Sequence, residues 1–194
     1  ASTALEEINQ TVNRATTLAN QMLSLAKVEQ VRQLQEFELL DWADIVRAVA
    51  LDVSPLIAQK ELDFEIRSQP CKVQAHDWML RELTRNLLHN AIRYTQRGGQ
   101  VTVRLGRDGR FATVSVRDNG PGMPAHELRR AGERFFRGSG VTQPGSGLGL
   151  AIVREIARQH GGEATIDRSP ELGGARVTVR FAPGPRLAPG VVSS

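Results

Sequence analysis

This chain of 194 residues has little cysteine, no long apolar run and no concentrated basic charge. A single cysteine, Cys71, excludes an internal disulfide and any metal site made of cysteines alone. No apolar run reaches the about 18 residues that a membrane-spanning helix requires, so we expect no contact with a membrane. The net charge of +4 is diffuse, and no basic stripe alternates with aromatic residues, which argues against a nucleic-acid partner.

Hydrophobic residues make up 40% of the chain, which is typical of a globular protein with a sizeable core. The chain starts within a helical pattern and lacks an initiator methionine, so we interpret it as a piece of a longer protein. We divide it into a helix at residues 1–36, a domain at 37–183 and a tail at 184–194. The Pro, Gly and Ser content of the tail predicts disorder.

Apolar residues near the N-terminus recur at alternating spacings of three and four, which predicts a long amphipathic helix. A lone helix of this kind cannot bury its apolar stripe, so we expect a partner helix. We favour a bundle between chains; the alternative is a helix that packs on its own domain. The stripe consists of Leu5, Ile8, Val12, Ala15, Ala19, Met22 and Ala26, widened by Leu18 and Leu25.

The rest of the chain predicts an alternation of helices and strands. Phe37 to Leu40 is expected to be a short extended linker. Asp41 then caps a helix that should run to about Gln59, with a kink or break at Pro55. The predicted strands are 62–66, 71–75, 100–105, 111–117, 163–167 and 175–181, and a last helix closes at the glycine cap after His160.

The helix predicted for residues 77–95 carries a polar row that its apolar face does not explain. Glu82, Asn86 and Asn90 lie four residues apart and therefore share one face. Asparagine is a mediocre helix former, so two of them in line need a reason. Exposure to solvent is one interpretation; the other is a ligand site, because amide oxygens suit Mg²⁺.

Two further groups of residues suit the ends of a nucleotide. Arg93 and Tyr94 follow on the next turn, where an arginine can pair with phosphate and a tyrosine ring can lie against a base. Asp118 ends a strand and enters a Gly-Pro-Gly turn, which places its carboxylate at the lip of a pocket. There it can accept a hydrogen bond from an exocyclic amine. The alternative for Asp118 is an ordinary turn with a surface carboxylate.

A glycine-rich run, Gly145 to Leu150, precedes the last predicted helix. Free main-chain N–H groups and the positive end of the helix dipole form a phosphate site in physical terms, to which Ser146 adds a hydroxyl. Upstream, Phe135 and Phe136 could anchor a lid on the core, and Arg137 could reach a phosphate. Simple core packing is the alternative for Phe135.

Four of these segments, in this order, resemble the ATP-binding boxes of sensor histidine kinases. The resemblance covers residues 39–182 and implies an α/β fold, the two-layer Bergerat sandwich shared with gyrase, heat-shock and mismatch-repair ATPases. It also implies that the N-terminal helix is the second helix of a dimerisation hairpin, through which the intact protein forms a homodimer. Residues 86–95 resemble the N box, 118–122 the first glycine box, 133–137 the F box and 145–150 the second glycine box.

The resemblance assigns roles to residues of this chain, with ATP and Mg²⁺ as the ligands. Asn90 would be the principal Mg²⁺ ligand, with Asn86 close by. Arg93 stands where many family members have lysine, so charge is kept while geometry differs. The implied nucleotide-binding residues are Asn90, Arg93, Tyr94, Asp118, Gly120, Gly122, Arg137, Gly145, Ser146, Gly147, Leu148 and Gly149, with residues 138–144 as the ATP lid.

The phospho-accepting histidine that the family requires has no match here. The family places it on the first hairpin helix, before an acidic residue and an arginine. None of the four histidines has that context at a plausible position, so we expect this chain to bind Mg-ATP without phosphorylating itself. Glu82 is a candidate general base by its reach along the helix face; the alternative is a base on the absent hairpin helix. The histidines are His76, His89, His126 and His160.

The resemblance further implies a cytoplasmic piece of a sensor in the bacterial inner membrane, whose phosphate passes to an aspartate of a response-regulator receiver domain. Two alternatives stay open. One is an ATPase that drives a conformational clamp, although such relatives usually carry a glutamate where this chain has Asn86. The other is a nucleotide-regulated interaction module without transfer activity.

Overall fold

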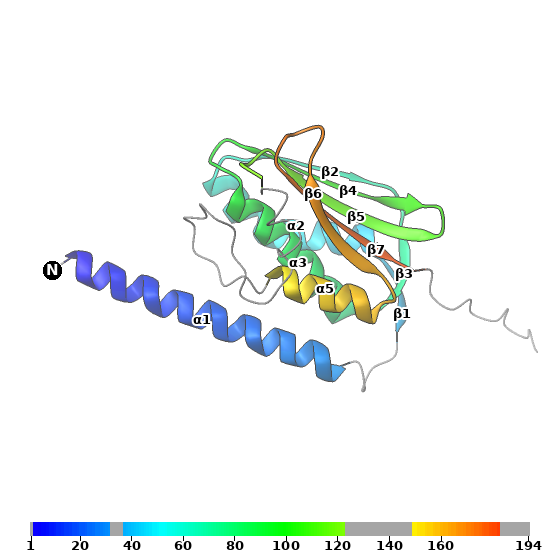
Figure 1. Ribbon diagram of the computed structural model, residues 1–194, viewed down its shortest axis with the longest axis horizontal. Helices are drawn as coiled ribbons and strands as arrows, with labels where there is room; N and C mark the ends of the chain where they lie inside the picture. The colour runs from blue at the N-terminus through cyan, green and yellow to red at the C-terminus, as the bar shows by residue number, and fades with distance from the viewer. Residues whose placement is uncertain (1, 32–36, 123–148, 183–194) are drawn as a thin grey trace, which may run out of the picture.

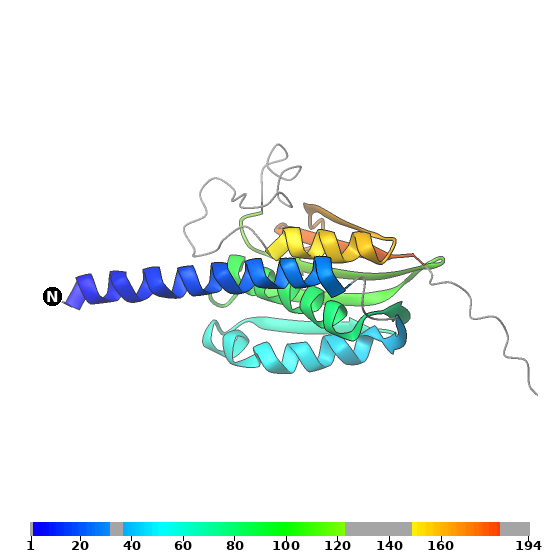
Figure 2. The same cartoon turned by 90° about the horizontal axis from the view of Figure 1, so that it is seen from below.

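The computed structural model describes residues 2–31, 37–122 and 149–182 of the chain. It consists of a long helix, α1 (Ser2–Val31), and an α/β unit in which three helices cover one face of a sheet (Figures 1 and 2). These helices are α2 (Trp42–Gln59), α3 (Asp77–Tyr94) and α5 (Gly149–Gln159). None of the described helices combines the length and the apolarity needed to cross a membrane. The two-layer α/β fold that we expected, preceded by a long helix, is confirmed.

The main sheet has five strands in the order β2-β4-β5-β7-β6, with β2 parallel to β4 and the other neighbours antiparallel. A separate antiparallel pair joins β1 to β3, so the expected linker at 37–40 is in fact largely a strand. Its pairing partner lies far along the chain, which is why its local pattern did not reveal it. The strands are β1 (Glu38–Asp41), β2 (Asp63–Ser68), β3 (Lys72–Ala75), β4 (Gln100–Asp108), β5 (Phe111–Asp118), β6 (Glu163–Arg168) and β7 (Ala175–Phe181).

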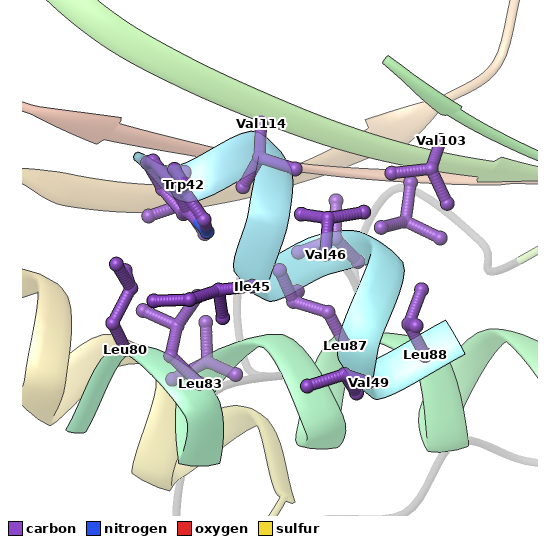
Figure 3. Packing of buried hydrophobic residues seen from close by; sticks show 14 of the residues in the cluster. Trp42, Ile45, Val46, Val49, Leu80, Leu83, Leu87, Leu88, Val103 and Val114 are labelled. Atoms are coloured by element: carbon purple, nitrogen blue, oxygen red, sulfur yellow. The ribbon is translucent and has the colours of Figure 1, made fainter. Parts of the chain in front are cut away.

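The core lies between the sheet and the helices, where alternate residues of the strands meet the apolar faces of α2 and α3 (Figure 3). Val103 and Val114 project from the sheet toward these helices, as strand alternation requires. Trp42 is fully buried, and its Nε1 donates to Thr84 Oγ1 at 3.2 Å, so its one polar atom is satisfied. Helix α3 is central and contacts both α2 and α5.

Helix α2 shows why a proline does not always break a helix. Asp41 caps it as predicted, its carboxylate accepting from Ala43 N at 3.0 Å. The helix nevertheless continues through Pro55 to Gln59, so the predicted break is wrong. Pro55 has no N–H to give to the carbonyl of Leu51, and the Ser54 hydroxyl donates to that carbonyl instead, at 2.7 Å.

Helix α1 is attached to the rest of the molecule at its C-terminal end. Leu25 and Val28 are buried there, and Gln159 of α5 donates to Val28 O at 3.1 Å. Toward the N-terminus the stripe is uncovered, with Leu5 62% and Ile8 60% exposed. The C-terminal end of α1 therefore packs on its own domain, as the alternative interpretation expected. For the uncovered N-terminal part, the bundle between chains stays a prediction.

Candidate functional site

Asn86 is the most enclosed member of the polar row on α3. It is 9% exposed, so exposure to solvent does not explain it. Its Nδ2 donates to Glu82 O at 2.8 Å and to Glu82 Oε1 at 3.3 Å. Glu82 also accepts from Arg85 at 3.4 Å. With the nitrogen held in this way, the amide presents its oxygen, Oδ1, as the free acceptor for another group.

The oxygen of Asn86 faces the start of α5. A Cβ added at Gly149, the first residue of α5, would lie 3.4 Å from Asn86 Oδ1. The row on α3 and the end of the glycine-rich run thus meet, and the absence of a side chain at Gly149 keeps the space beside the amide open. The N-terminal end of a helix attracts anions through its free N–H groups and its dipole. The predicted residues Arg137, Gly145, Ser146, Gly147 and Leu148, like the lid at 138–144, lie outside the described residues.

The other predicted residues of α3 lie further along the helix: Asn90 one turn beyond Asn86, and Arg93 and Tyr94 on the last turn. All three are half-buried. The carbonyl of Tyr94 would be 2.6 Å from a Cβ added at Gly120, so the turn after β5 sits directly against this helix end. Because a side chain would not fit at Gly120, the close approach requires glycine.

Lys60 secures the C-terminal end of α3, although no sequence pattern marks this lysine as different from a surface lysine. Its Nζ donates to the carbonyls of Ile92 (2.6 Å), Arg93 (3.0 Å) and Thr95 (2.9 Å). A cation at a helix C-terminus satisfies free carbonyls and complements the dipole. Burial, followed by the charge of Arg93, lowers the pKa of Lys60. Lys60 therefore fixes the end of the helix that carries Arg93 and Tyr94.

Asp118 stands at the end of β5 and is 5% exposed, so the alternative of a surface carboxylate is wrong. Its Oδ1 accepts from Gly120 N at 2.9 Å and from Ala175 N at 3.1 Å. Burial raises the pKa of Asp118, and these two hydrogen bonds partly oppose that shift. Both bonds fall on one oxygen, which orients the carboxylate, and no hydrogen bond from the described residues reaches the other oxygen, Oδ2. Gly122 has φ +70°, which favours glycine in this turn.

Gly174, in the turn between β6 and β7, is a further residue of this site. A Cβ there would lie 2.3 Å from both the carbonyl oxygen and Oδ1 of Asp118. The turn between β6 and β7 can therefore approach Asp118 only because position 174 is glycine. The pair Gly173-Gly174 was the signal that could have indicated a close approach.

The histidines that the structure describes do not form a phosphorylation site of the expected kind. His160 is 7% exposed and stacks between Phe37 and Phe181, with ring centroids 4.9 and 4.7 Å apart. Burial lowers the pKa of His160 to about 4. His76 is also buried, and its main-chain N–H donates to His160 Nε2 at 3.4 Å. These rings belong to the core. His126 lies outside the described residues.

Taken together, the arrangement is an elongated site along α3. One end combines an amide oxygen with a helix start, which suits a metal ion and phosphates, and the other has a buried carboxylate that suits a base. Residues 76–185 match the family described as histidine kinase-, DNA gyrase B-, and HSP90-like ATPase. The chain belongs to this family, and it is an ATP-binding domain.

Its relatives within the family are sensor kinases. Sensor protein QseC of Escherichia coli O157:H7 is 38% identical over 160 residues, which cover 81% of this chain and 35% of the relative. Sensor protein kinase PmrB of Pseudomonas aeruginosa is 32% identical over 176 residues, covering 90% and 37%. The structure of the mycobacterial sensor histidine kinase MprB matches with a TM-score of 0.67 and 30% identity, covering 75% of this chain and 97% of that one. The chain spans about a third of the length of the curated relatives.

Proposed function

We propose that this chain is the catalytic portion of a sensor histidine kinase, which binds Mg-ATP along α3 and transfers its γ-phosphate to a histidine on a helix outside this chain. The observation that carries the proposal is the proximity of Asn86 Oδ1 to the start of α5, where a Cβ added at Gly149 would lie 3.4 Å from that oxygen. It joins a hard metal ligand to an anion-binding helix end.

The spacing along α3 supports this orientation of the nucleotide. A helix rises about 1.5 Å per residue, so Asn86 and Tyr94 are about 12 Å apart along the axis. An adenine, a ribose and three phosphates in line span a comparable length. The phosphates would therefore lie at Asn86 and Gly149, and the adenine at Tyr94 and Asp118, whose Oδ2 would accept from the exocyclic amine.

The metal-binding role falls on the asparagines. Asn90 would be the principal Mg²⁺ ligand, with Asn86 beside it, and the ion would offset charge on the phosphates. The donor set fits this ion, because Mg²⁺ prefers oxygen ligands and keeps several waters. Arg93 would contact the phosphates. Among the described residues, no group of three or more His, Cys, Asp or Glu side chains offers another metal site.

Phosphoryl transfer needs positioning and charge stabilisation more than covalent chemistry from the protein. A nitrogen of the accepting histidine would bond to the γ-phosphorus as the bond to the β–γ bridging oxygen breaks and ADP leaves. Glu82 stays the candidate base for the histidine proton. Its hydrogen bond with Asn86 Nδ2, at 3.3 Å, also gives it a positioning role toward the metal ligand.

The partners proposed follow from the same assignment. The exposed stripe of α1, including Leu5 and Ile8, would pack in a homodimer through the hairpin helices of the intact protein. The phosphate would pass to an aspartate of a response-regulator receiver domain. The parent would be a sensor in the bacterial inner membrane, with this portion on the cytoplasmic side.

Metal-dependent nucleotide binding tests the site. Titration calorimetry with a non-hydrolysable ATP analogue should give tighter binding with Mg²⁺ than without it. Asn90→Ala should remove that difference, whereas Gln96→Ala, which removes an exposed amide just beyond α3, should keep it. An Asn90→Ala protein with undiminished dependence on Mg²⁺ would count against the ligand assignment.

Transfer of the γ-phosphate tests the activity. With γ-labelled ATP the chain alone should stay unlabelled. The same chain joined behind a hairpin helix that carries a phospho-accepting histidine should acquire an acid-labile label. Stable label on the chain alone would contradict the proposal, and steady release of phosphate without any acceptor helix would support an ATPase clamp instead.

A further inference from the structure

The turn at residues 169–174, between β6 and β7, is tied to the outer face of the sheet by one carboxylate (Figure 1). Glu171 accepts from Arg104 of β4 in a paired geometry, Nη1 to Oε1 at 3.0 Å and Nη2 to Oε2 at 2.6 Å. It also accepts from Arg117 of β5 at 2.7 Å. These arginines lower the pKa of Glu171, so it is charged at neutral pH.

The next residues along the chain contact the other face of the same strand end. Ala175 N donates to Asp118 Oδ1 at 3.1 Å, and Gly174 lies against Asp118. Arg117 and Asp118 are consecutive in β5, so their side chains point to opposite faces of the sheet. The segment from Glu171 to Ala175 therefore contacts both faces of the sheet at the end of β5. Glu171 pairs with Arg117 on one face, and Ala175 N–H donates to Asp118 on the other.

The turn is stiff enough to link these two contacts. Ser169 is 1% exposed, its main-chain N–H donates to Gly174 O at 2.7 Å, and its main-chain carbonyl accepts from Gly173 N at 2.9 Å. The hydroxyl of Ser169 accepts from Leu172 N at 3.2 Å. With these three bonds closing the turn, a movement at Glu171 is passed on to the main chain beside Asp118.

We propose that Glu171 is a positioning residue for base recognition: it holds the turn in place so that Ala175 N–H orients the Asp118 carboxylate toward the adenine amine. This inference rests on the proposed function. Isolated surface ion pairs contribute little to stability, whereas a carboxylate shared by two arginines, one of them in paired geometry, contributes more. The side chain of Arg117 is only 12% exposed, so its ion pair with Glu171 is partly shielded from solvent.

Loss of the Glu171 charge would leave two neighbouring guanidinium groups without their shared counterion and would loosen the turn. Asp118 would then lose one of its two orienting hydrogen bonds. A carboxylate free to rotate is a poorer acceptor for the adenine amine and a weaker barrier to guanine, which presents a carbonyl oxygen at the corresponding position. Both affinity and base preference should therefore change.

Titration of ADP and GDP into the full chain measures both effects. Glu171→Gln should weaken ADP binding roughly three- to tenfold and reduce the ratio of ADP to GDP affinity. Glu163→Gln is the matched control, because Glu163 forms an exposed pair with Arg180, at 3.8 Å, at the start of β6 on the same sheet. It should leave both quantities unchanged. Arg104→Lys, which keeps the charge but loses the paired geometry, should show a smaller loss in the same direction.

A double-mutant comparison separates this inference from the proposed function. Asp118→Asn should weaken ADP binding by itself, and adding Glu171→Gln to it should have no further effect. If the two losses multiply, or if Glu171→Gln binds ADP like the wild type, the positioning role is overturned while the nucleotide site stands. If Asp118→Asn binds ADP like the wild type, the proposed adenine contact itself is wrong.

Discussion

Replacing Gly174 by alanine tests how closely the turn between β6 and β7 must approach the candidate base site. The added Cβ would lie 2.3 Å from the carbonyl oxygen and from Oδ1 of Asp118, and 2.7 Å from Gly120 N. Ordinary contacts begin near 3.4 Å, so the turn or Asp118 would have to move by about 1 Å. Overpacking of this kind costs about 1–3 kcal/mol in the free energy of unfolding.

The same displacement should be visible in ligand binding. The bond from Ala175 N to Asp118 Oδ1, now 3.1 Å, would be lost, because a hydrogen bond does not survive a further lengthening of this size. Bonds to charged groups contribute about 1.5–3 kcal/mol to stability, and if half of this appears in binding, ADP affinity falls roughly three- to twelvefold. Urea unfolding and titration calorimetry measure the two effects.

Gly109→Ala, in the hairpin between β4 and β5, is the matched control for this substitution. Gly109 has φ +59° and no neighbouring atom within 4 Å of the added Cβ. Its replacement should cost about 1–2 kcal/mol of stability through the left-handed backbone alone and should leave ADP affinity unchanged. The reasoning fails if the two alanine variants bind ADP equally well.

Three further substitutions test other parts of the structure. Lys60→Met should lower the free energy of unfolding in urea by about 1–3 kcal/mol, because three carbonyls at the end of α3 lose their donor. Lys72→Met is the control: Lys72 is exposed, and its replacement should have little effect on stability. His160 is kept neutral, with its pKa lowered from 6.5 to about 4, whereas in the unfolded chain it gains a proton below pH 6.5. The free energy of unfolding should therefore be constant above pH 6.5 and decrease by about 3 kcal/mol toward pH 4. In His160→Phe the urea midpoint should decrease less over the same pH range. An equal decrease in the variant and the wild type would contradict the pKa assignment. Val28→Asp should release the end of α1 from α5, which faster amide hydrogen exchange in α1 would report, without changing ADP affinity.

Local patterns predicted most of the fold, and the differences arise where distant residues decide. The strands and helices lie within a few residues of their predicted positions, because alternation and capping are local signals. The β1 strand was missed because its pairing with β3 is a tertiary contact. The break at Pro55 was wrong because the hydroxyl of Ser54 replaces the missing donor. The stripe on α1 indicated burial but not that Leu25 would pack within this chain.

The residue types of the candidate site are a prediction from the sequence, and the structure adds the geometry of those residues that it describes. The row of asparagines on α3 stood out because asparagine is a mediocre helix former, and Asp118 stood out because it ends a predicted strand at a Gly-Pro-Gly turn. That Asn86 faces Gly149 could be known only from the fold, since the two residues are far apart in sequence. Lys60 was not predicted because its sequence context is that of any surface lysine. Ala175 was not predicted because it acts through its main-chain N–H, which every residue except proline has.

The central claim is that amide oxygens of α3 and the start of α5 hold the phosphates of Mg-ATP while Asp118 holds its adenine. A crystal structure of this chain with Mg²⁺ and a non-hydrolysable ATP analogue tests it most directly. We predict the ion within about 2.1 Å of Asn90 Oδ1, as octahedral Mg²⁺ requires, and the adenine amine within hydrogen-bonding distance of Asp118. A nucleotide bound elsewhere, or bound here with neither Asn90 nor Asn86 facing the metal and phosphates, would contradict the claim.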